Sequence, residues 1–461
     1  MSKHMPLDVR VAIEQDNPSI WRDEDRCIKC GMCKRVCEGS LAVHGHYDLQ
    51  KTADRAVCIY CGQCANVCPP SSIQEVPEWE RVRDAIADPD AVVVVSTSPA
   101  VRVSVGELFG EEPGAFVQGK LISLLRALGI DYVLDTNFAA DLTVMEEAHE
   151  LVGRIKAGEM LPQFTSCCPA WVRYVETFYP ELRGNLSTAK SPIGMQGPTI
   201  KTYFAGCKGI DPKRIVNVAL TPCTAKKFEI RREEMAAAAA RTGIEGMRDM
   251  DYVVTVRELA AWAQAAGIDW DALSDDGAYD DLMGSASGAG VIFGNTGGVM
   301  EAALRTAYHM VTGDDAPADL LELEPIRGYE GIRRAMVDLG GVSVPVAVIH
   351  GTANARAFIE GEDAAGGEGL SAFRFVEVMA CPGGCIGGGG QPKHLGPAAD
   401  KARRARIASL YERDRALPRR CSYENPQIEA LYRDFYGEPG SVRAECMLHT
   451  AYVDNSLELG A

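Results

Sequence analysis

The sequence predicts a mixed α+β and α/β chain in two parts, a small cysteine-rich module followed by a large α/β domain. Eight of the 16 cysteines fall in two matching motifs near the N-terminus, and after Glu78 short apolar segments alternate with helical patterns. We place an N-terminal extension at residues 1–19, the module at 20–78 and the large domain at 79–461. The 461 residues are 46% hydrophobic and 24% charged, which is typical of a globular protein.

Charge and hydropathy argue against two classes of partner. The net charge of −17 leaves no surplus of Lys and Arg for a phosphate backbone, so we expect no nucleic-acid binding. No run of about 18 uncharged apolar residues occurs, so we expect no membrane-spanning helix. The start of the chain is charged and lacks the apolar core of a secretory signal. We therefore expect a cytoplasmic protein.

Two C-x2-C-x2-C-x3-C motifs indicate iron–sulfur clusters. The first contains Cys27, Cys30, Cys33 and Cys37, and the second contains Cys58, Cys61, Cys64 and Cys68. In bacterial two-cluster ferredoxins the fourth cysteine of each such motif binds the other cluster. We therefore expect a ferredoxin-like module with one [4Fe–4S] cluster on Cys27, Cys30, Cys33 and Cys68, and another on Cys58, Cys61, Cys64 and Cys37.

Zinc is the alternative for these eight cysteines. Structural zinc sites usually separate two C-x2-C pairs by a dozen or more residues, so that the pairs close one tetrahedron. Two compact and duplicated motifs fit that arrangement poorly. One departure from the ferredoxin pattern is Glu38, which follows Cys37 where proline is common, whereas Cys68 keeps its Pro69. Because such clusters only transfer electrons, the large domain must hold the reaction site.

Three apolar segments of the large domain are predicted to be buried strands, at residues 91–95, 215–220 and 375–379. The second leads into Cys223 and the third into Cys381. In α/β folds, sites form where the carboxyl ends of strands turn into loops. We therefore expect a site at these strand ends.

Three cysteine-bearing segments outside the module are the candidates for that site. Residues 165–171 contain Cys167 and Cys168, residues 221–229 contain Cys223, and the glycine-rich segment 377–392 contains Cys381 and Cys385. Glycines remove side chains, and we expect those of the last segment to let the backbone wrap a bulky inorganic group. Individually these segments are weak or moderate indicators of a metal site, but their combination is specific.

Together the three segments resemble the signature loops of [FeFe]-hydrogenases, and the resemblance extends from about Cys27 to Tyr452. It implies the short form of that family, in which two ferredoxin-type clusters feed an active site called the H-cluster. The H-cluster is a [4Fe–4S] cluster joined to a diiron unit with CO, cyanide and an azadithiolate bridge. The resemblance implies reversible oxidation of H2 and reduction of protons. It also implies maturation proteins that supply the diiron unit, and an electron carrier such as ferredoxin.

The resemblance also assigns roles to single residues. It implies that the [4Fe–4S] part of the H-cluster is held by Cys168, Cys223, Cys381 and Cys385, with Cys385 as the bridging thiolate. Cys167 matches the family's proton-donating thiol, and Lys226 matches the lysine that pairs with a cyanide. Phe293, in a glycine-rich segment at 284–298, is expected to be a wall of the cofactor pocket.

The sequence predicts a helix around residues 141–158. Thr143 and Glu146 are expected to form a capping box at its start, and Gly158 is expected to end it. On periodicity alone, the acidic flank of this helix would be a solvated edge. The resemblance instead implies a proton route through Cys167, Glu147, Ser187, Glu150 and Arg154, with a water between the thiol and Glu147.

Several positions in the expected pocket depart from the better-known members of the family. Thr221 stands where they have a methionine, and Ile193 stands where many have a glutamine. Ser98 and Pro99 fall where Ala-Pro-Ser is frequent, whereas Met379 is retained. These changes should alter the electrostatics around the diiron unit, and with it catalytic bias, rate and oxygen tolerance.

Two other classes of function remain open on the sequence. A sensing relative of the family would bind a similar cofactor with little turnover, and the presence of Cys167 counts against it. A Narf-like iron–sulfur assembly protein would share the fold without the diiron unit, and the intact cysteine set with Lys226 counts against it. A basic collar around the first motif is compatible with an acidic redox partner: Arg22, Arg26, Lys29, Lys34, Arg35 and Arg55.

Overall fold

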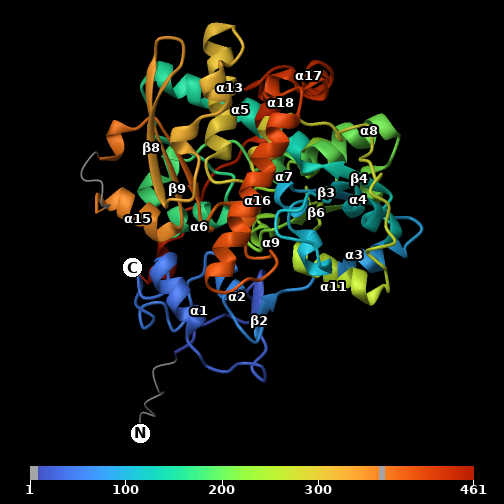
Figure 1. The fold of residues 1–461 in the computed structure, drawn as a ribbon. Helices are drawn as coiled ribbons and strands as arrows, with labels where there is room; N and C mark the ends of the chain where they lie inside the picture. Colours follow the sequence, from blue (N-terminus) through green and yellow to red (C-terminus); the bar gives the residue numbers. More distant parts are fainter. Residues whose placement is uncertain (1–8, 363–368, 461) are drawn as a thin grey trace.

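The computed structural model describes residues 9–362 and 369–460 of the chain. Its strands are β1 (Ile20–Arg22), β2 (Ile73–Glu75), β3 (Val92–Thr97), β4 (Tyr132–Asp135), β5 (Gln163–Phe164), β6 (Ile215–Thr221), β7 (Tyr252–Thr255), β8 (Ile332–Asp338), β9 (Ser343–His350) and β10 (Phe375–Met379). The three strand segments expected from the sequence are confirmed as β3, β6 and β10, the first two with slightly shifted bounds. The N-terminal module lies at one end of the molecule, below the large domain in Figure 1.

Helices cover both sheets of the large domain, and one short helix lies within each cysteine motif. They are α1 (Met32–Arg35), α2 (Gln63–Asn66), α3 (Trp79–Ile86), α4 (Gln118–Ala127), α5 (Thr136–Ala157), α6 (Pro169–Phe178), α7 (Pro192–Thr199), α8 (Ala205–Lys208), α9 (Lys226–Glu229), α10 (Ala237–Thr242), α11 (Val256–Ala265), α12 (Gly288–Ile292), α13 (Gly298–Thr312), α14 (Ala318–Leu321), α15 (Thr352–Glu360), α16 (Pro397–Ala416), α17 (Pro426–Leu431) and α18 (Val442–Leu448). Among the described residues, none of these helices is long and apolar enough to cross a bilayer.

The module is built on a small antiparallel pair and two one-turn helices. Strand β1 pairs with β2, so that Ile20 lies opposite Glu75. Helices α1 and α2 follow Gly31 and Gly62, whose φ angles of 75° and 68° lie in the left-handed region that favours glycine. Each cysteine motif therefore bends sharply between its second and third cysteines.

The first large sheet has the parallel order β4-β3-β6-β7. Side chains alternate along β3, so that Val93 and Val95 pack on the face covered by α3, α4 and α11. Val94 packs on the opposite face with residues of α5 and α7. This strand is buried on both faces, which explains its continuous run of valines.

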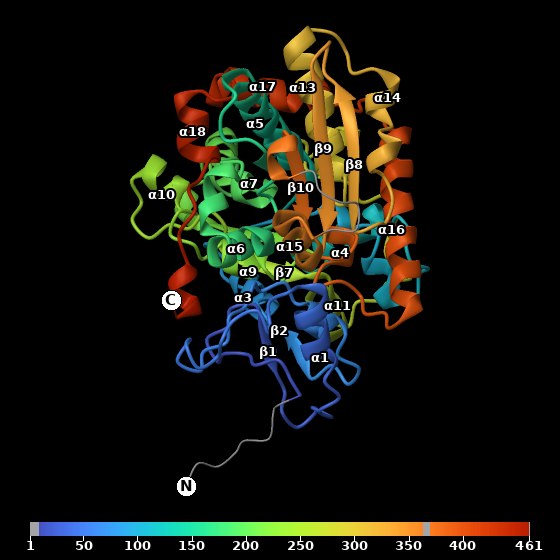
Figure 2. The same ribbon diagram turned by 90° about the vertical axis from the view of Figure 1, so that its left-hand side faces the viewer.

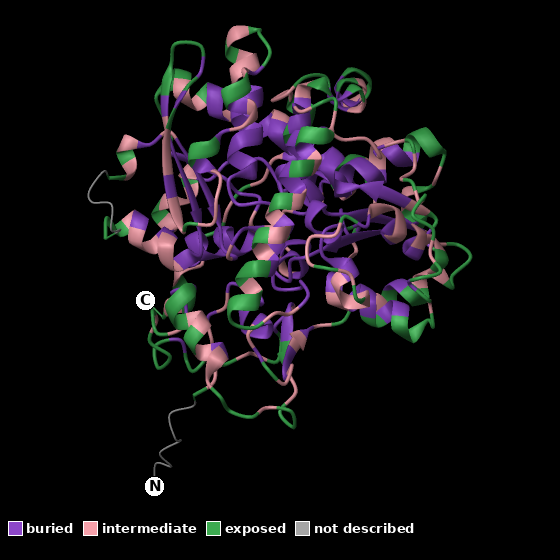
Figure 3. Ribbon diagram, viewed as in Figure 1, coloured by how far each residue is buried: buried purple, intermediate pink, exposed green. Residues whose placement is uncertain are grey.

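The second large sheet has the order β5-β10-β9-β8, with only β8 antiparallel to its neighbour. Val376 and Val378 of β10 pack against α6 and α15 on one face. Phe375 packs against α13 on the other. The long hairpin of β8 and β9 lies at the left-hand side of the molecule in Figure 1 and faces the viewer in Figure 2. Figure 3 shows that the central strands and helices are buried.

Helix α5 differs from the expectation at its start. It begins at Thr136, where the Asp135 side chain accepts a hydrogen bond from the Asn137 backbone N–H. The prediction of a capping box at Thr143 was wrong, because Thr143 lies inside the helix. Its hydroxyl lies 3.4 Å from the Lys190 carbonyl oxygen. The expected end is confirmed, since Gly158 caps the helix with φ 70°. The helix is buried on several sides, so amphipathic periodicity could not reveal its first two turns.

Candidate active site

The carboxyl ends of strands from both sheets meet around one cavity. Ser98 follows β3, Thr221 ends β6, Met379 ends β10, and Cys167 follows β5. The prediction that a site forms at strand ends is therefore supported by four strands rather than three. The lining also includes Pro99, Ile193 and Phe293, so every pocket residue expected from the sequence lies on this cavity.

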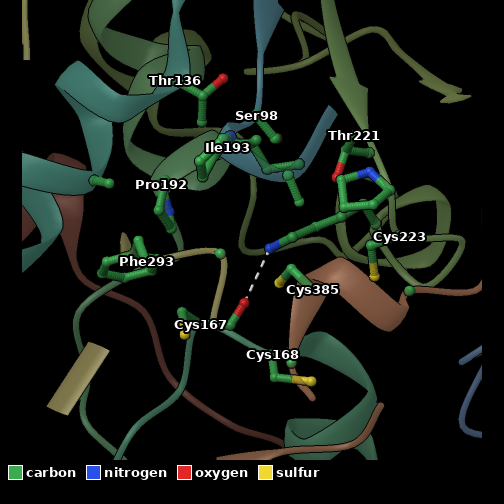
Figure 4. A pocket seen from close by; sticks show the side chains of 18 of the residues that line it. Ser98, Thr136, Cys167, Cys168, Pro192, Ile193, Thr221, Cys223, Phe293 and Cys385 are labelled. Carbon is green, nitrogen blue, oxygen red and sulfur yellow. Dashed lines mark hydrogen bonds between the residues drawn. The ribbon is translucent and has the colours of Figure 1, made fainter. Parts of the chain in front are cut away.

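Four cysteines from three segments line the same cavity. They are Cys168, Cys223, Cys381 and Cys385. In Figure 4 the side chains of Cys168, Cys223 and Cys385 surround a common space. Burial raises the pKa of the Cys223 thiol to about 12, because a buried thiolate is costly without positive charge beside it. Bound iron would supply that charge. Four convergent sulfur donors fit a [4Fe–4S] cluster. The rest of the cavity wall is mainly apolar, which fits a part of the cofactor that no further side chain coordinates.

The glycines of the 383–390 segment lie against neighbouring parts of the protein, and Gly384 and Gly388 also line the cavity. A Cβ on Gly388 would lie 2.4 Å from the Pro222 carbonyl oxygen, and one on Gly390 would lie 2.5 Å from Thr255 Cβ. A Cβ on Gly384 would lie 2.6 Å from the Thr296 nitrogen. These glycines therefore let neighbouring protein approach the cysteine loop closely. The expectation that they also leave room for an inorganic group stays a prediction.

Lys226 extends from α9 toward the cavity. Its ammonium donates a 3.1 Å hydrogen bond to the Cys167 carbonyl, drawn as a dashed line in Figure 4, and forms a 2.7 Å ion pair with Glu229. Burial disfavours the charge, but Glu229 and the neighbouring thiols outweigh burial and raise the pKa of Lys226. A fixed cation thus stands at the edge of a cavity that is otherwise apolar.

Cys167 and Glu147 are buried neighbours beside the cavity. Cys167 is 7% exposed and Glu147 is 1% exposed. Neither carboxylate oxygen of Glu147 makes a hydrogen bond of normal geometry. Burial raises the pKa of Glu147 well above its ordinary value, and the charges of Glu150 and Glu377 raise it further. Burial and these neighbouring charges therefore favour the protonated form of Glu147.

Ser187 and Glu150 continue from Glu147 toward the surface. The Ser187 hydroxyl donates a 2.6 Å hydrogen bond to Glu150, and it lies near enough to Glu147 to lower that group's pKa. Arg154 donates a 2.6 Å hydrogen bond to the other Glu150 oxygen. The structure thus brings the five predicted proton-route residues together in the predicted order.

The module cysteines fall into the two predicted groups. Cys27, Cys30, Cys33 and Cys68 line one cavity, although they come from both motifs. In the second group, burial raises the pKa of Cys37 to about 12, and the neighbouring Cys58 contributes to that rise. Cys64 likewise interacts with Cys58 and Cys37.

The second group lies against the large domain. Burial raises the pKa of Cys61 well above its ordinary value, and the nearby Cys381 thiol raises it further. Side-chain amides of Gln63 and Asn66 donate hydrogen bonds of 2.8 and 2.9 Å to the carbonyls of Gly387 and Gly388. The two cysteine centres are therefore joined directly through the loop that carries Cys385.

Comparison with known families agrees with this site. Residues 91–389 match the family described as iron only hydrogenase large subunit, C-terminal domain, and residues 400–455 match iron hydrogenase small subunit. Residues 19–69 match the 4Fe-4S dicluster domain. The chain belongs to the iron-only hydrogenase family. It is therefore an oxidoreductase of the family that oxidises H2 and reduces protons at an H-cluster.

Individual hydrogenases resemble the chain over most of its length. It is 41% identical to iron hydrogenase 1 of Clostridium pasteurianum, over 97% of this chain and 78% of the relative. It is 44% identical to the periplasmic [Fe] hydrogenase large subunit of Nitratidesulfovibrio vulgaris, over 80% of this chain and 85% of the relative. A solved structure of [FeFe]-hydrogenase HydA1 from Chlamydomonas reinhardtii superposes with a TM-score of 0.70 and 39% identity, covering 82% of this chain and 98% of that chain.

The hydrogenase site contains residues that the sequence analysis did not single out. Thr136, Ala140 and Pro192 line the cavity, and Glu229 holds Lys226. Thr136 was not predicted, because the helix was expected to begin around residue 141, whereas α5 begins at Thr136. No pattern marked Ala140 or Pro192, whereas Glu229 lies three residues after Lys226 on a short helix and could have been found by that spacing.

Proposed function

We propose that the chain catalyses 2 H+ + 2 e− ⇌ H2 reversibly and exchanges electrons with a ferredoxin-like partner through two accessory [4Fe–4S] clusters. The observation that carries this proposal is the position of Cys167, which lines the cysteine-ringed cavity and lies near enough to the buried Glu147 for the charge of that carboxylate to raise the pKa of the thiol. A thiol placed between a cofactor pocket and a proton-holding carboxyl suits an enzyme that turns over protons.

The proposed ligand sets follow the grouping of the cysteines. Cys168, Cys223, Cys381 and Cys385 would hold the [4Fe–4S] part of the H-cluster, with Cys385 bridging to the diiron unit. Cys27, Cys30, Cys33 and Cys68 would hold the outer accessory cluster, and Cys58, Cys61, Cys64 and Cys37 the inner one. The H-cluster would supply the redox chemistry of H2 when bound. The accessory clusters would lie in the domain at residues 20–78, and the H-cluster in the domain at residues 79–461.

The residues of the chain would supply the proton. Burial raises the pKa of Glu147 and so favours its protonated form, which can pass a proton to the Cys167 sulfur after that thiol has given up its own, or exchange a proton with the Ser187 hydroxyl. Ser187 exchanges protons with Glu150 across their 2.6 Å hydrogen bond. Arg154 holds Glu150 in place at the outer end. Lys226 fixes the Cys167 backbone and presents its charge to the cavity.

Electrons would arrive at the exposed end of the module. Cys30 is exposed there, and Arg26, Lys29 and Arg35 are exposed around it. This basic surface on an acidic protein would attract an acidic carrier such as a ferredoxin. Two members of the expected collar do not belong to it, because Arg22 is turned inward to the Val11 carbonyl and Arg55 pairs with Asp16 beside Cys58.

Thr221 and Ile193 would change how this site works without removing it. Both line the cavity, and both are at least 97% buried. A hydroxyl and an alkyl group there present different dipoles to the diiron unit than a thioether and an amide would. A sensing hydrogenase of low turnover is therefore the second candidate. It shares the pocket and differs in rate.

The remaining expectations concern the surroundings of the enzyme. Maturation proteins would supply the diiron unit, and the cytoplasm would be its compartment. One relative, 42% identical over 94% of this chain and 74% of its own length, is the NADP-reducing hydrogenase subunit HndD of Solidesulfovibrio fructosivorans. Membership in a larger complex is therefore one arrangement in which this chain would work.

Infrared spectroscopy after loading with the clusters and the diiron cofactor tests the assignment. We expect bands from CO and cyanide that remain bound after desalting, and the same bands should be lost in Cys385→Ala. An iron–sulfur assembly factor, such as the Danio rerio narfl protein that is 29% identical to this chain, offers the contrasting outcome of cluster binding without such bands. That outcome would refute the hydrogenase proposal.

A further inference from the structure

Arg154 stands at the outer end of the proton route but cannot carry the proton farther. An arginine guanidinium does not give up its proton in proteins, so it can donate hydrogen bonds and cannot relay a proton. Besides Glu150, it donates to backbone carbonyls, namely those of Met160, Gly184, Asn185 and Leu186. A proton held by Glu150 therefore needs another acceptor on its way to solvent.

Thr188 offers that acceptor on the other side of Glu150. Its hydroxyl lies 3.2 Å from Glu150 Oε1 and 2.8 Å from His449 Nδ1. The Thr188 backbone N–H also donates to both Glu150 oxygens, at 3.2 and 3.0 Å, which keeps the carboxylate beside the hydroxyl. A hydroxyl both donates and accepts, so it can take a proton from one neighbour as it gives one to the other.

His449 is built to receive a proton at Nδ1. Its Nε2 lies 3.1 Å from a fully buried carboxylate, Glu146, which is held by Tyr432 and the Gly440 backbone N–H at 2.5 and 2.8 Å. A carboxylate only accepts hydrogen bonds, so Nε2 carries a proton and Nδ1 is the free base. Burial disfavours the imidazolium, but Glu146 outweighs burial and raises the pKa of His449.

His449 lies close to the surface, although only 7% of its own side chain is exposed. Its Nδ1 lies 4.0 Å from the carboxylate of Glu445, whose side chain is 55% exposed. The charges that act on the imidazole are those of Glu146 and Glu150 from α5 and Glu445 from α18, all negative. They stabilise an imidazolium that lies within reach of solvent.

We propose that His449 is the outer proton relay of this hydrogenase, linked to Glu150 by the Thr188 hydroxyl. Glu150 gives its proton to Thr188 Oγ1, and the Thr188 hydroxyl gives its own proton to His449 Nδ1. The resulting imidazolium releases the Nδ1 proton to water beside Glu445, and uptake of protons runs the same steps in reverse. This relay rests on the proposed function and adds to it the group that exchanges protons with solvent.

The first test is a matched pair of variants at Thr188. Thr188→Val keeps the shape and the backbone N–H but removes the relaying hydroxyl, whereas Thr188→Ser keeps the hydroxyl. We expect H2 evolution by the loaded enzyme to fall about 10²-fold in the valine variant and by less than about threefold in the serine variant. Infrared bands of equal intensity in both variants show that the pocket is intact.

The second test removes His449. In His449→Ala we expect a loss similar to that of Thr188→Val, and partial recovery when imidazole is added to the buffer. A structural defect would not be rescued by a free base. Full activity in both Thr188→Val and His449→Ala, across pH 6 to 9, would overturn the relay.

A titration that needs no cofactor separates this proposal from the proposed function. In cofactor-free protein with 15N-labelled histidine, we expect His449 to titrate above the ordinary value of about 6.5. Glu146→Gln should lower that midpoint. If even the unmodified enzyme produces no H2, the proposed function fails. The titration then decides separately whether Glu146 supports a protonated His449. An unchanged His449 midpoint in Glu146→Gln would refute that support and with it the relay.

Discussion

Gly62 of the N-terminal module and Gly389 of the cysteine loop meet backbone to backbone. A Cβ on Gly62 would lie 3.1 Å from Gly389 Cα, and one on Gly389 would lie 2.3 Å from the Cys61 carbonyl oxygen. Arg257 binds both sides of this contact, with hydrogen bonds to the Asn66 side chain and to the Gly389 carbonyl. The absence of two side chains therefore sets how closely the inner accessory cysteines approach the active site.

Gly389→Ala should separate electron supply from catalysis. The added methyl group must push the module away, and a misplacement of about 1 Å can cost up to about 10²-fold in rate. We expect H2 evolution driven by an external electron carrier to fall by about 10-fold or more. Exchange of H2 with D2O, which needs no external electrons, should fall much less. Gly206→Ala, at a position with open space around it, is the control, and equal behaviour of the two variants would contradict this role.

Glu147→Gln should remove turnover and leave the cofactor in place. Glutamine keeps the volume of the side chain but cannot give up a proton, and a positioned acid or base contributes about 10² to 10⁴-fold in rate. Glu181→Gln, at an exposed position, is the control. Activity within about twofold of the unmodified enzyme, with unchanged infrared bands, would exclude Glu147 from the proton route.

Lys226→Met should destabilise the protein through the charge that it leaves behind. Glu229 is 94% buried at its side chain, and removing one partner of a buried ion pair costs roughly 3–5 kcal/mol. The double variant Lys226→Met with Glu229→Gln should recover most of the thermal stability. It should not recover H2 evolution, because the cation at the cavity is still missing. Recovery of both properties would show that Lys226 has only a structural role.

His350 should make folding stability depend on pH. It is 7% exposed at the end of β9, and burial lowers its pKa to about 4. Because the unfolded chain binds this proton with a pKa of about 6.5, stability is present above pH 6.5 and is lost as pH falls toward 4. The loss amounts to about 3 kcal/mol at most. In cofactor-free protein, His350→Gln should flatten the fall of the thermal midpoint over this range, and an unchanged slope would contradict the assignment.

Much of the fold and the site could be predicted because it is local in sequence. Cysteine spacing placed the module, and short apolar segments marked buried strands such as β3 and β6. The ends of β6 and β10 could then be placed at one site, because sites form at that edge of a sheet. The pocket residues of the large domain came from resemblance, and the structure brings them together around one cavity.

The rest could not be predicted because it depends on contacts between distant segments. Thr188 and His449 are separated by 261 positions, and no pattern joins a threonine to a histidine over that distance. The start of α5 was hidden because burial on several sides removes the amphipathic signal. The sequence does not show which distant segment packs against each glycine of the cysteine loop. The contact between Gly62 and Gly389 is therefore seen only in the structure.

The most direct test of the central claim is H2 evolution from reduced viologen under strict anaerobiosis, with the protein loaded with its clusters and the diiron cofactor. We predict rapid evolution by the unmodified chain and a collapse of that rate in Cys167→Ala, although both proteins keep their CO and cyanide bands. Slow or absent evolution by the unmodified chain with those bands present would contradict a catalytic hydrogenase. It would identify a sensor whose Thr221 and Ile193 surroundings suppress turnover.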